Sequence, residues 1–222
     1  MNERKSVVVE EYLQVIYSLL AEKEPIKAVT LTKWLKSSPS TVHATLSRLQ
    51  RDKLVKVTKK KEIVLTDKGM EKAERLIRRH RLVEWFLCNT LGISWHEVHK
   101  HAHVLEHGLT PLVEEKLAEF LGFPQFCPHG TPLPGQEDSL PKNIAALSDF
   151  EVGDEIEVIN VGESLEESLE LMKFLQEKSI KPGKRHHIRE KVDITRTIVL
   201  ESGSDRATLT YDIAEKIKAI KV

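Results

Sequence analysis

Two helical segments followed by a lysine-tipped hairpin are the feature that most constrains the fold of this chain. Apolar residues recur at helical spacing from Val7 to Leu20, a short helix is expected around Leu31–Leu35, and a longer helix follows in SSPSTVHATLSRLQRDKLV. Ser37 or Ser38 is available to cap the longer helix, and Pro39 falls in its first turn, where a missing N–H is harmless. Helices joined by such a tight polar turn are typical of a helix-turn-helix.

Two short strand-like runs come next, at residues 54–58 and 63–66, with Lys59, Lys60 and Lys61 at the tip between them. A helix-turn-helix followed by a hairpin predicts a winged helix, which places its second helix in the major groove of DNA. The lysines would lie near phosphates and add affinity that does not depend on sequence. The residues expected at DNA are Ser38, Pro39, Ser40, Thr41, His43, Thr45, Arg48, Lys59 and Lys60, with Arg51 as a further candidate.

Charge is distributed unevenly along the chain, although the formal net charge is zero. Residues 1–80 contain 18 Lys and Arg against 10 Asp and Glu, a net charge of +8, so the remainder carries −8. A basic unit joined to an acidic body suits phosphate binding in one part and cation binding in the other. The alternative at this point is a small helical bundle with a solvated lysine turn.

Two longer helices are expected after the hairpin, over Asp67–Leu91 and Ser94–Leu121, with Gly122 as the stop of the second. Both carry apolar faces. Helices that follow a winged helix commonly pair across a twofold axis, because a symmetric dimer presents two recognition helices to a palindromic site. We therefore expect a homodimer that binds palindromic double-stranded operator DNA.

The C-terminal third changes character. The Pro- and Gly-rich segment FCPHGTPLPGQEDSLPKN predicts a linker from Cys127 to Asn143, with a boundary near Gln136. Four strand-like runs then surround one helix over Leu165–Lys178, and a small five-strand barrel is the expected architecture. The fold class is thus mainly α with a C-terminal β unit. The four runs are VGDEIEVINV, RHHIREKV, TRTIVLES and RATLTYD.

Composition limits where the protein is expected to work. The chain is 40% apolar, which is enough to bury a core, yet it contains no run of about 18 apolar residues. Its N-terminus has no signal-peptide pattern, so neither a membrane nor export is indicated. The two cysteines, Cys88 and Cys127, are too few for a disulfide framework, which agrees with a reducing compartment. We expect a cytoplasmic protein.

Six of the ten histidines fall between His80 and His107, and their spacing indicates a metal site. His80 and Glu84 are four residues apart on one expected helix. On the next, four residues at i, i+4, i+7 and i+8 would lie along one face, and imidazole with carboxylate is a ligand set for Mn, Fe, Co, Ni or Zn. The alternative is a charged stripe that faces solvent. The four residues are His99, His103, Glu106 and His107.

The segment His103-Val-Leu-Glu106-His107 also matches H-x-x-E-H, a metallopeptidase motif in which two histidines bind zinc and the glutamate is the general base. Such a site needs a further protein ligand, a water position and a substrate cleft, and a short motif recurs by chance. It would also leave the DNA-binding pattern unexplained. We expect a protein that is not an enzyme and keep a zinc-dependent hydrolase as the alternative.

Several segments together resemble the diphtheria-toxin-repressor family, which includes iron-, manganese- and zinc-responsive regulators. They are EEYLQVIYSL, SSPSTVHATLSRLQRDKLV, LTDKG, RRHRLVEWFL, VHKHAHVLEHGLTPLVEEKLAEFLG and FCPHGTPLPG. The likeness spans almost the whole chain. With the elements above, it implies a winged-helix domain at 1–68, a helical dimerisation and metal-binding domain at 69–136, a linker at 137–147 and an SH3-like domain at 148–222.

The resemblance implies a primary metal site formed by one residue of the first helix, Glu11, and three of the later helix, His103, Glu106 and His107. A glutamate at position 11 is similar to the ligand of manganese-responsive members. At position 103, however, this chain has a His where relatives have a Cys or a carboxylate. The implied metal is Mn(II) or Fe(II), with Zn(II) as the alternative.

An ancillary site is implied as well. It uses His80 and Glu84, with His99 in one branch of the family and the pair Cys127 and His129 in another, and both sets are present. The C-terminal domain would add a carboxylate, with Glu167 and Glu170 as equal candidates, although either is also explained as a charge favoured at a helix N-terminus.

The resemblance also implies a mechanism. Glu11 belongs to the DNA-binding domain and the other primary ligands to the dimerisation domain, so one ion would join them and fix the spacing of the two recognition helices. The implied function is a metal-dependent repressor of metal-uptake genes. A third possibility is a winged helix that binds DNA constitutively around a structural metal.

Overall fold

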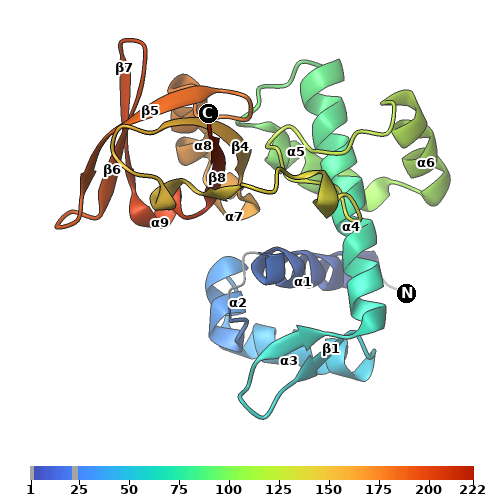
Figure 1. Cartoon of the computed structure of the whole chain (residues 1–222). Helices are drawn as coiled ribbons and strands as arrows, with labels where there is room; N and C mark the ends of the chain where they lie inside the picture. The colour runs from blue at the N-terminus through green and yellow to red at the C-terminus, as the bar shows by residue number, and fades with distance from the viewer. Residues whose placement is uncertain (1–2, 22–24) are drawn as a thin grey trace. The chain divides into compact units, whose positions relative to one another are not determined.

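The computed structural model describes residues 3–21 and 25–222. The chain divides into two compact units, residues 1–79 and 80–222, and the boundary along the chain falls within the long helix α4 (Asp67–Trp85) (Figure 1). We describe each unit by itself. The finer division predicted from the sequence, with boundaries after residues 68 and 136, stays a prediction.

The first unit has the element order of a winged helix. Its hairpin is antiparallel, with Val55 opposite Leu65 and Val57 opposite Ile63, and the tip closes through a hydrogen bond of 2.8 Å from Thr58 N to Glu62 O. The predicted strands are correct to within a residue. The elements are α1 (Glu3–Ala21), α2 (Ala28–Trp34), α3 (Pro39–Arg51), β1 (Val55–Val57), β2 (Ile63–Leu65) and the first part of α4.

Helix α1 supplies the centre of the first core. Its buried side chains recur at spacings of three and four residues, so one face of the helix is apolar. This face packs with Leu31 of α2 and Leu49 of α3, both fully buried. Because α3 is packed on one side, its other side is presented to solvent. The α1 residues are Val9, Tyr12, Leu13, Ile16 and Leu19.

Ser38, not Ser37, caps α3: its hydroxyl accepts a hydrogen bond of 3.2 Å from Thr41 N, and Pro39 occupies the first turn. The cap satisfies one of the backbone donors that every helix start leaves unpaired. It therefore fixes where the recognition helix begins.

In the second unit, α4 runs on into a π-helical turn, η1 (Phe86–Thr90), so the predicted helix over Asp67–Leu91 is essentially correct. The single helix predicted over Ser94–Leu121 is wrong. The structure has α5 (Val98–Leu105), a 3-10 turn η2 (Glu106–Gly108) and α6 (Pro111–Phe120). Thr110 caps α6 through Val113 N at 3.3 Å, and proline at the first position cannot continue a preceding helix.

The segment predicted as a linker is largely built into the second unit. Phe126 pairs with Pro132 in an isolated bridge, and Cys127 N donates to Thr131 O at 2.9 Å, so residues 126–132 form a closed turn. A 3-10 turn, η3 (Glu137–Ser139), follows it. Further on, Leu147 is fully buried in the core that also contains the strands of the sheet, so the predicted linker ends inside a packed part of the chain.

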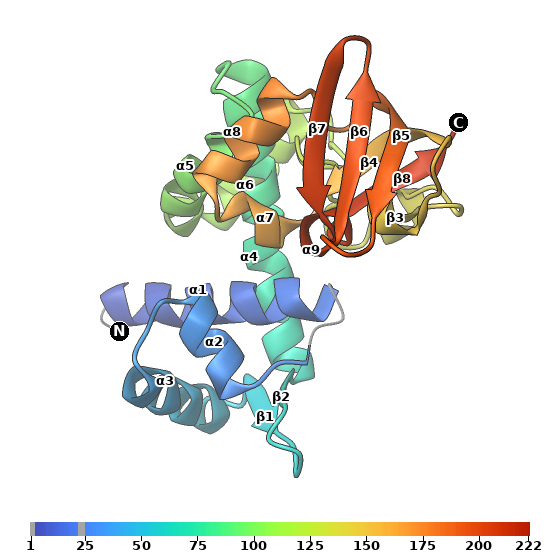
Figure 2. The same cartoon turned by 90° about the vertical axis from the view of Figure 1, so that its left-hand side faces the viewer.

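The C-terminal part is a six-stranded antiparallel sheet in the order β3-β8-β4-β5-β6-β7, and Figure 2 shows β5, β6 and β7 side by side. The four runs found in the sequence are β4 to β7. The expected number of five strands is corrected to six: β3 has only two residues, too few to give an alternating pattern, and the run that forms β8 was not among those assigned. The strands are β3 (Ala145–Ala146), β4 (Glu155–Val161), β5 (Arg185–Val192), β6 (Thr197–Ser202), β7 (Asp205–Thr210) and β8 (Ile217–Lys221).

Short helices complete the sheet: η4 (Leu147–Asp149), α9 (Tyr211–Ala214), and α7 (Glu163–Glu166) with α8 (Leu169–Glu177) between β4 and β5. The helix predicted over Leu165–Lys178 is therefore split. Ser168 is the reason, because it caps α8 by accepting from Leu171 N at 3.3 Å. None of the described helices is long and apolar enough to cross a lipid bilayer.

Candidate metal centre and nucleic-acid interface

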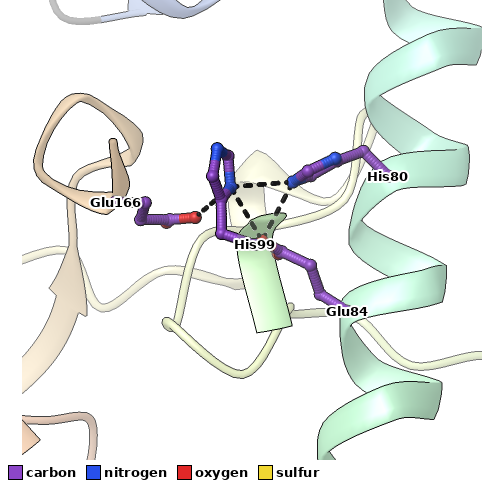
Figure 3. A group of neighbouring side chains, drawn as sticks. All are labelled: His80, Glu84, His99 and Glu166. Carbon is purple, nitrogen blue, oxygen red and sulfur yellow. Dashed lines mark hydrogen bonds and ion pairs between the residues drawn. The ribbon is translucent and has the colours of Figure 1, made fainter. Parts of the chain in front are cut away.

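The C-terminal end of α4 starts the candidate metal centre. His80 and Glu84 are four residues apart, which puts them on one face of the helix, and both are almost completely buried. His99 comes from the first turn of α5 and Glu166 from the last residue of α7. Figure 3 shows the four side chains pointing toward one another. We call them the main cluster.

The donor atoms of the main cluster lie very close together. Glu84 Oε1 is 2.9 Å from His80 Nε2 and 3.2 Å from His99 Nδ1, and His99 Nδ1 is 2.9 Å from Glu166 Oε2. The four ligand atoms lie within 4.8 Å of one another. Two imidazole nitrogens and two carboxylate oxygens at this separation are a ligand set suited to a divalent transition metal.

A second group shares Glu84 with the main cluster. It consists of Glu84, Cys127 and His129, whose ligand atoms also lie within 4.8 Å of one another, and we call it the thiol cluster. Cys127 and His129 sit in the closed turn of residues 126–132, next to Gly130. Val161 N of β4 donates to His129 O at 2.9 Å, so the turn is held against the sheet.

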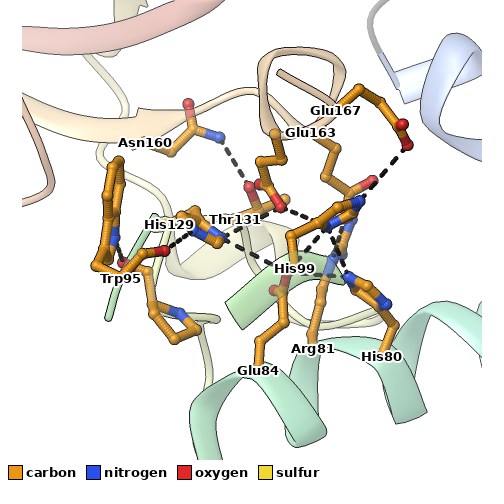
Figure 4. A network of polar contacts seen from close by, with 12 residues as sticks. His80, Arg81, Glu84, Trp95, His99, His129, Thr131, Asn160, Glu163 and Glu167 are labelled. Atoms are coloured by element: carbon orange, nitrogen blue, oxygen red, sulfur yellow. Dashed lines mark hydrogen bonds and ion pairs between the residues drawn. The ribbon is translucent and has the colours of Figure 1, made fainter. Parts of the chain in front are cut away.

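The orientation of His129 fits a metal ligand. Its Nε2 is 3.0 Å from the carbonyl oxygen of Trp95, which only accepts, so Nε2 carries the proton (Figure 4). This leaves Nδ1 facing Glu84 at 3.6 Å and Glu166 at 3.2 Å. A ligating histidine commonly donates its other ring N–H to a backbone carbonyl in this way.

Buried polar atoms without hydrogen bonds provide a test of the fit. Within the described residues, His129 Nδ1 and both carboxylate oxygens of Glu166 are buried and make no hydrogen bond, although ion-pair partners lie close by. Buried polar groups are normally hydrogen-bonded, and orphaned ones are costly. A cation among these atoms would satisfy them, so the residues present fit a metal ion.

Without a metal, the charge balance of these clusters depends on which side chains are protonated. Burial lowers the pKa of His80, but Glu84 and Glu106 outweigh it and raise that pKa to about 10. Glu106 responds in the opposite sense: burial raises its pKa, and His80 with His103 brings it down to about 2. Without a metal, protonated imidazoles therefore compensate the buried carboxylates.

The pKa values of His99 and His129 shift in the same direction as that of His80. Burial alone would lower their pKa values, but Glu166 holds the pKa of His99 and of His129 well above the ordinary range, with Glu84 contributing to both. Burial raises the pKa of the Cys127 thiol. A divalent ion would replace these protons, so binding is expected to release them.

A third group lies on the other side of the His80 ring. His80 Nδ1 is 2.5 Å from Glu106 Oε2, while Glu106 Oε1 is 3.3 Å from His103 Nδ1 and 3.5 Å from His107 Nε2. Glu106 is fully buried. His80, His103 and Glu106 offer three ligand atoms within 4.8 Å, and we call them the Glu106 cluster.

Arg81 lies next to His80 and is almost completely buried. Its Nε and Nη2 are 2.8 and 2.7 Å from Glu163 Oε1, and its Nη1 donates to Pro132 O. One guanidinium group thus contacts both α7 and the turn of residues 126–132.

The structure brings most of the predicted ligands together but changes the carboxylate from the C-terminal part. Glu167 is exposed and reaches His99 Nε2 only at 3.5 Å, and Glu170 is exposed on α8. Glu166, which the sequence analysis missed, is the buried member. The cap at Ser168 was the available signal, since it ends the preceding turn at Glu166 and Glu167. Glu11 lies on α1 in the first unit, and its part in a site stays a prediction.

The single stripe predicted for His99, His103, Glu106 and His107 is also corrected. Because α5 gives way to the 3-10 turn η2, these residues divide. His99 enters the main cluster, whereas His103 and Glu106 enter the other, with His107 beside them.

The residues predicted at DNA lie where a winged helix would use them. Those at the start of α3 and at the hairpin tip are exposed, while Thr45 and Arg48 are partly buried. Arg48 Nε is 3.7 Å from the Asp52 carboxylate. The exposed ones are Ser38, Pro39, Ser40, Thr41, His43, Lys59 and Lys60.

Six large apolar side chains within residues 104–123 of the second unit are exposed. Phe120 is 69% exposed and Val104 74%, whereas scattered single residues are the norm on a monomer. We call these six residues the apolar face: Val104, Leu105, Leu112, Val113, Phe120 and Phe123. Such a face is typical of an interface between protein chains.

A winged helix together with a helical unit that carries a candidate metal centre and an apolar face defines a class, the metal-responsive DNA-binding regulators. Comparisons with known proteins agree. Residues 6–63 match the model "Iron dependent repressor, N-terminal DNA binding domain", and residues 66–135 match "Iron dependent repressor, metal binding and dimerisation domain". The chain belongs to the iron-dependent repressor family.

Individual relatives cover nearly the full length. The chain is 30% identical to the iron-dependent repressor IdeR of Mycobacterium bovis over 100% of both chains, and 30% identical to the diphtheria toxin repressor of Corynebacterium glutamicum over 96% of both. A solved manganese-dependent transcriptional repressor in complex with manganese has a TM-score of 0.82 at 27% identity, covering 96% of this chain and 100% of that one. Neither the family models nor these relatives support the zinc-dependent hydrolase.

Proposed function

We propose that this chain is a metal-activated, homodimeric repressor that binds a palindromic operator in the cytoplasm. The observation that carries the proposal is the pair of buried clusters that share Glu84. In them, the Glu166 oxygens and His129 Nδ1 make no hydrogen bond although they face His99, Glu84 and one another. Buried donors arranged in this way are stabilised by a cation and are costly without one.

The proposed ligands form two sites. In the ancillary site, His80, Glu84, His99 and Glu166 hold the ion, with Cys127 and His129 beside them. In the primary site, His103, Glu106 and His107 hold a second ion. Glu11 is proposed as the fourth primary ligand on the family resemblance alone.

Nitrogen and oxygen donors favour Mn(II) or Fe(II), and the Cys127 thiol makes Zn(II) the alternative. The relatives differ in the metals that their names carry: one solved structure is of the manganese-dependent type, and another is ScaR with bound Zn²⁺, which has a TM-score of 0.81 at 27% identity. Each of these metal ions would supply positive charge at the buried carboxylates. For this chain we propose Mn(II) or Fe(II).

The effect of the ion on the fold depends on the residues that surround it. His80, His99 and His129 carry protons that compensate the carboxylates, and a cation that replaces these protons stabilises the arrangement of α4, α5 and the turn of residues 126–132. A metal shifts the DNA-binding equilibrium only if its affinity differs between the two states, and a coupling of about 1–3 kcal/mol is typical.

The test is operator binding measured by fluorescence anisotropy. The probe is a DNA duplex that the protein selects from a random pool in the presence of Mn(II). We expect binding that appears with Mn(II) or Fe(II), disappears with chelator, and is lost in Glu84→Gln. Glu170→Gln is the matched control, because it removes an exposed carboxylate of the same unit.

Two results contradict the proposal. Binding that is unaffected by chelator would favour a constitutive winged helix with a structural metal. Turnover of a peptide substrate that depends on Glu106 would revive the hydrolase.

A further inference from the structure

Two of the segments that supply metal ligands lie outside the long helices. The turn of residues 126–132 carries Cys127 and His129, and α7 carries Glu166. Both must be held against α4 for their donor atoms to meet Glu84. The contacts made by Arg81 bear on how this is done.

Arg81 is buried, with 3% of its surface exposed, and it contacts both segments at once. Its Nε and Nη2 bind Glu163 Oε1 at 2.8 and 2.7 Å, and its Nη1 donates to Pro132 O. Glu163 is the first residue of α7 and Glu166 the last, so the two lie one helical turn apart. Pro132 closes the base of the turn through its bridge to Phe126.

We propose that Arg81 is the positioning residue of the ancillary site: it holds the Glu166 segment and the Cys127–His129 turn against α4 before a metal arrives. Arg81 does not coordinate the ion. The proposal rests on the proposed function only in that a divalent metal binds the main cluster.

The geometry of the guanidinium explains why arginine stands here. A planar group with several fixed N–H donors satisfies a carboxylate and a carbonyl in different directions, whereas a lysine ammonium is a single point charge. Leaving a buried arginine without partners costs much free energy. The contacts of Arg81 with Glu163 and Pro132 therefore keep the two segments in place. A preformed site avoids the cost of ordering both segments when the ion binds.

The experiment measures Mn(II) binding to the full-length chain by isothermal titration calorimetry. Arg81→Met keeps the bulk of the side chain and removes its donors. We expect the step assigned to the main cluster to weaken by about 10- to 100-fold, the range found when groups that orient metal ligands are removed. The step of the Glu106 cluster is expected to stay within about twofold. Glu84→Gln assigns the two steps, because only the main and thiol clusters contain Glu84.

Arg189→Met is the matched control. Arg189 also pairs with a carboxylate in the second unit, Glu201 at 2.6 Å, but on the surface of the sheet. Both Mn(II) steps are expected to match those of the unchanged protein.

A second readout separates positioning from a general loss of structure. Co(II) bound by the Cys127 thiolate gives a sulfur-to-metal absorption band, which Arg81→Met should diminish while the helix content of the chain is retained. Glu163→Ala removes only the link to α7, so it should have a smaller effect, and the double variant should be no worse than Arg81→Met, which removes both links. Glu163→Gln keeps an acceptor for Arg81 and should restore most of the affinity.

Mn(II) affinity and a Co(II) band unchanged in Arg81→Met would overturn the inference, and so would equal weakening of both steps. A different result would contradict the proposed function: the absence of metal-dependent operator binding in the unchanged protein.

Discussion

At the residue scale, His80 connects the groups of the candidate centre. Its Nε2 faces Glu84 and its Nδ1 faces Glu106, and the ring has almost no contact with solvent. In the metal-free protein it holds two buried carboxylates only while it is protonated on both nitrogens. The stability of that state must therefore depend on pH.

We predict that the free energy of unfolding of the metal-free protein falls as pH rises above neutrality. The folded pKa of His80, about 10, is raised above its ordinary value of 6.5, so its stabilisation is complete below 6.5 and is lost as pH rises through 10. His99 and His129 act in the same direction. Urea denaturation at a series of pH values measures this. The slope should be smaller in His80→Gln, and a stability that rises between pH 7 and 10 would contradict the assignment.

The same residues show what sequence reasoning can find. Spacing alone paired His80 with Glu84, because positions four residues apart share a helix face. It also marked Glu106, but within a single stripe that the structure divides. It could not choose among the glutamates of ESLEESLEL, since burial of Glu166 depends on where α7 ends and on the partner that holds Glu163.

At the element scale, the turn of residues 126–132 depends on one glycine. Gly130 has φ +84°, and a Cβ there would lie 2.0 Å from Ile159 O of β4. Neither the backbone conformation nor the contact tolerates a side chain. The frequent Pro and Gly residues of this stretch predict a linker, whereas in the structure they close the turn.

We predict that Gly130→Ala destabilises the protein by about 1–3 kcal/mol, because it adds backbone strain and a clash with β4. It should also weaken metal binding that uses Cys127 and His129. Thermal unfolding and a Mn(II) titration measure both effects. Gly135→Ala is the control: its φ is +82°, but a Cβ there meets nothing within 4 Å, so only the strain remains. Equal losses in the two variants would refute the role of the contact.

The hairpin makes a separate contribution. Lys59 and Lys60 are exposed at its tip, and lysines that contact phosphates add affinity that falls with salt. We predict that replacing both with Ala weakens binding to all DNA sequences to a similar degree and reduces the slope of log K against log salt by about two. Anisotropy at several salt concentrations measures this. Lys116→Ala, an exposed lysine of α6, should leave the slope unchanged.

At the scale of the whole molecule, the apolar face is the surface proposed for the second copy of the chain. Family membership includes a dimerisation domain over residues 66–135, and the face lies within it. A palindromic operator needs two recognition helices, so self-association and DNA binding should be lost together.

We predict that Phe120→Lys weakens self-association at least tenfold and operator binding with it, because it places a charge in an apolar interface. Sedimentation velocity and anisotropy measure the two. Ile194→Lys is the matched control, since Ile194 is 94% exposed but lies outside the face. A dimer that survives Phe120→Lys would place the interface elsewhere.

The sequence by itself determined the winged helix, the long helix α4 and the presence of metal-binding side chains. Helical periodicity, capping and residue spacing are local properties, and they reappear wherever the chain folds. Only the tertiary structure decided that Glu166 and His129 meet Glu84 and that the sheet has six strands. These outcomes depend on contacts between residues far apart in sequence, where burial and the positions of partners such as Arg81 determine which groups come together.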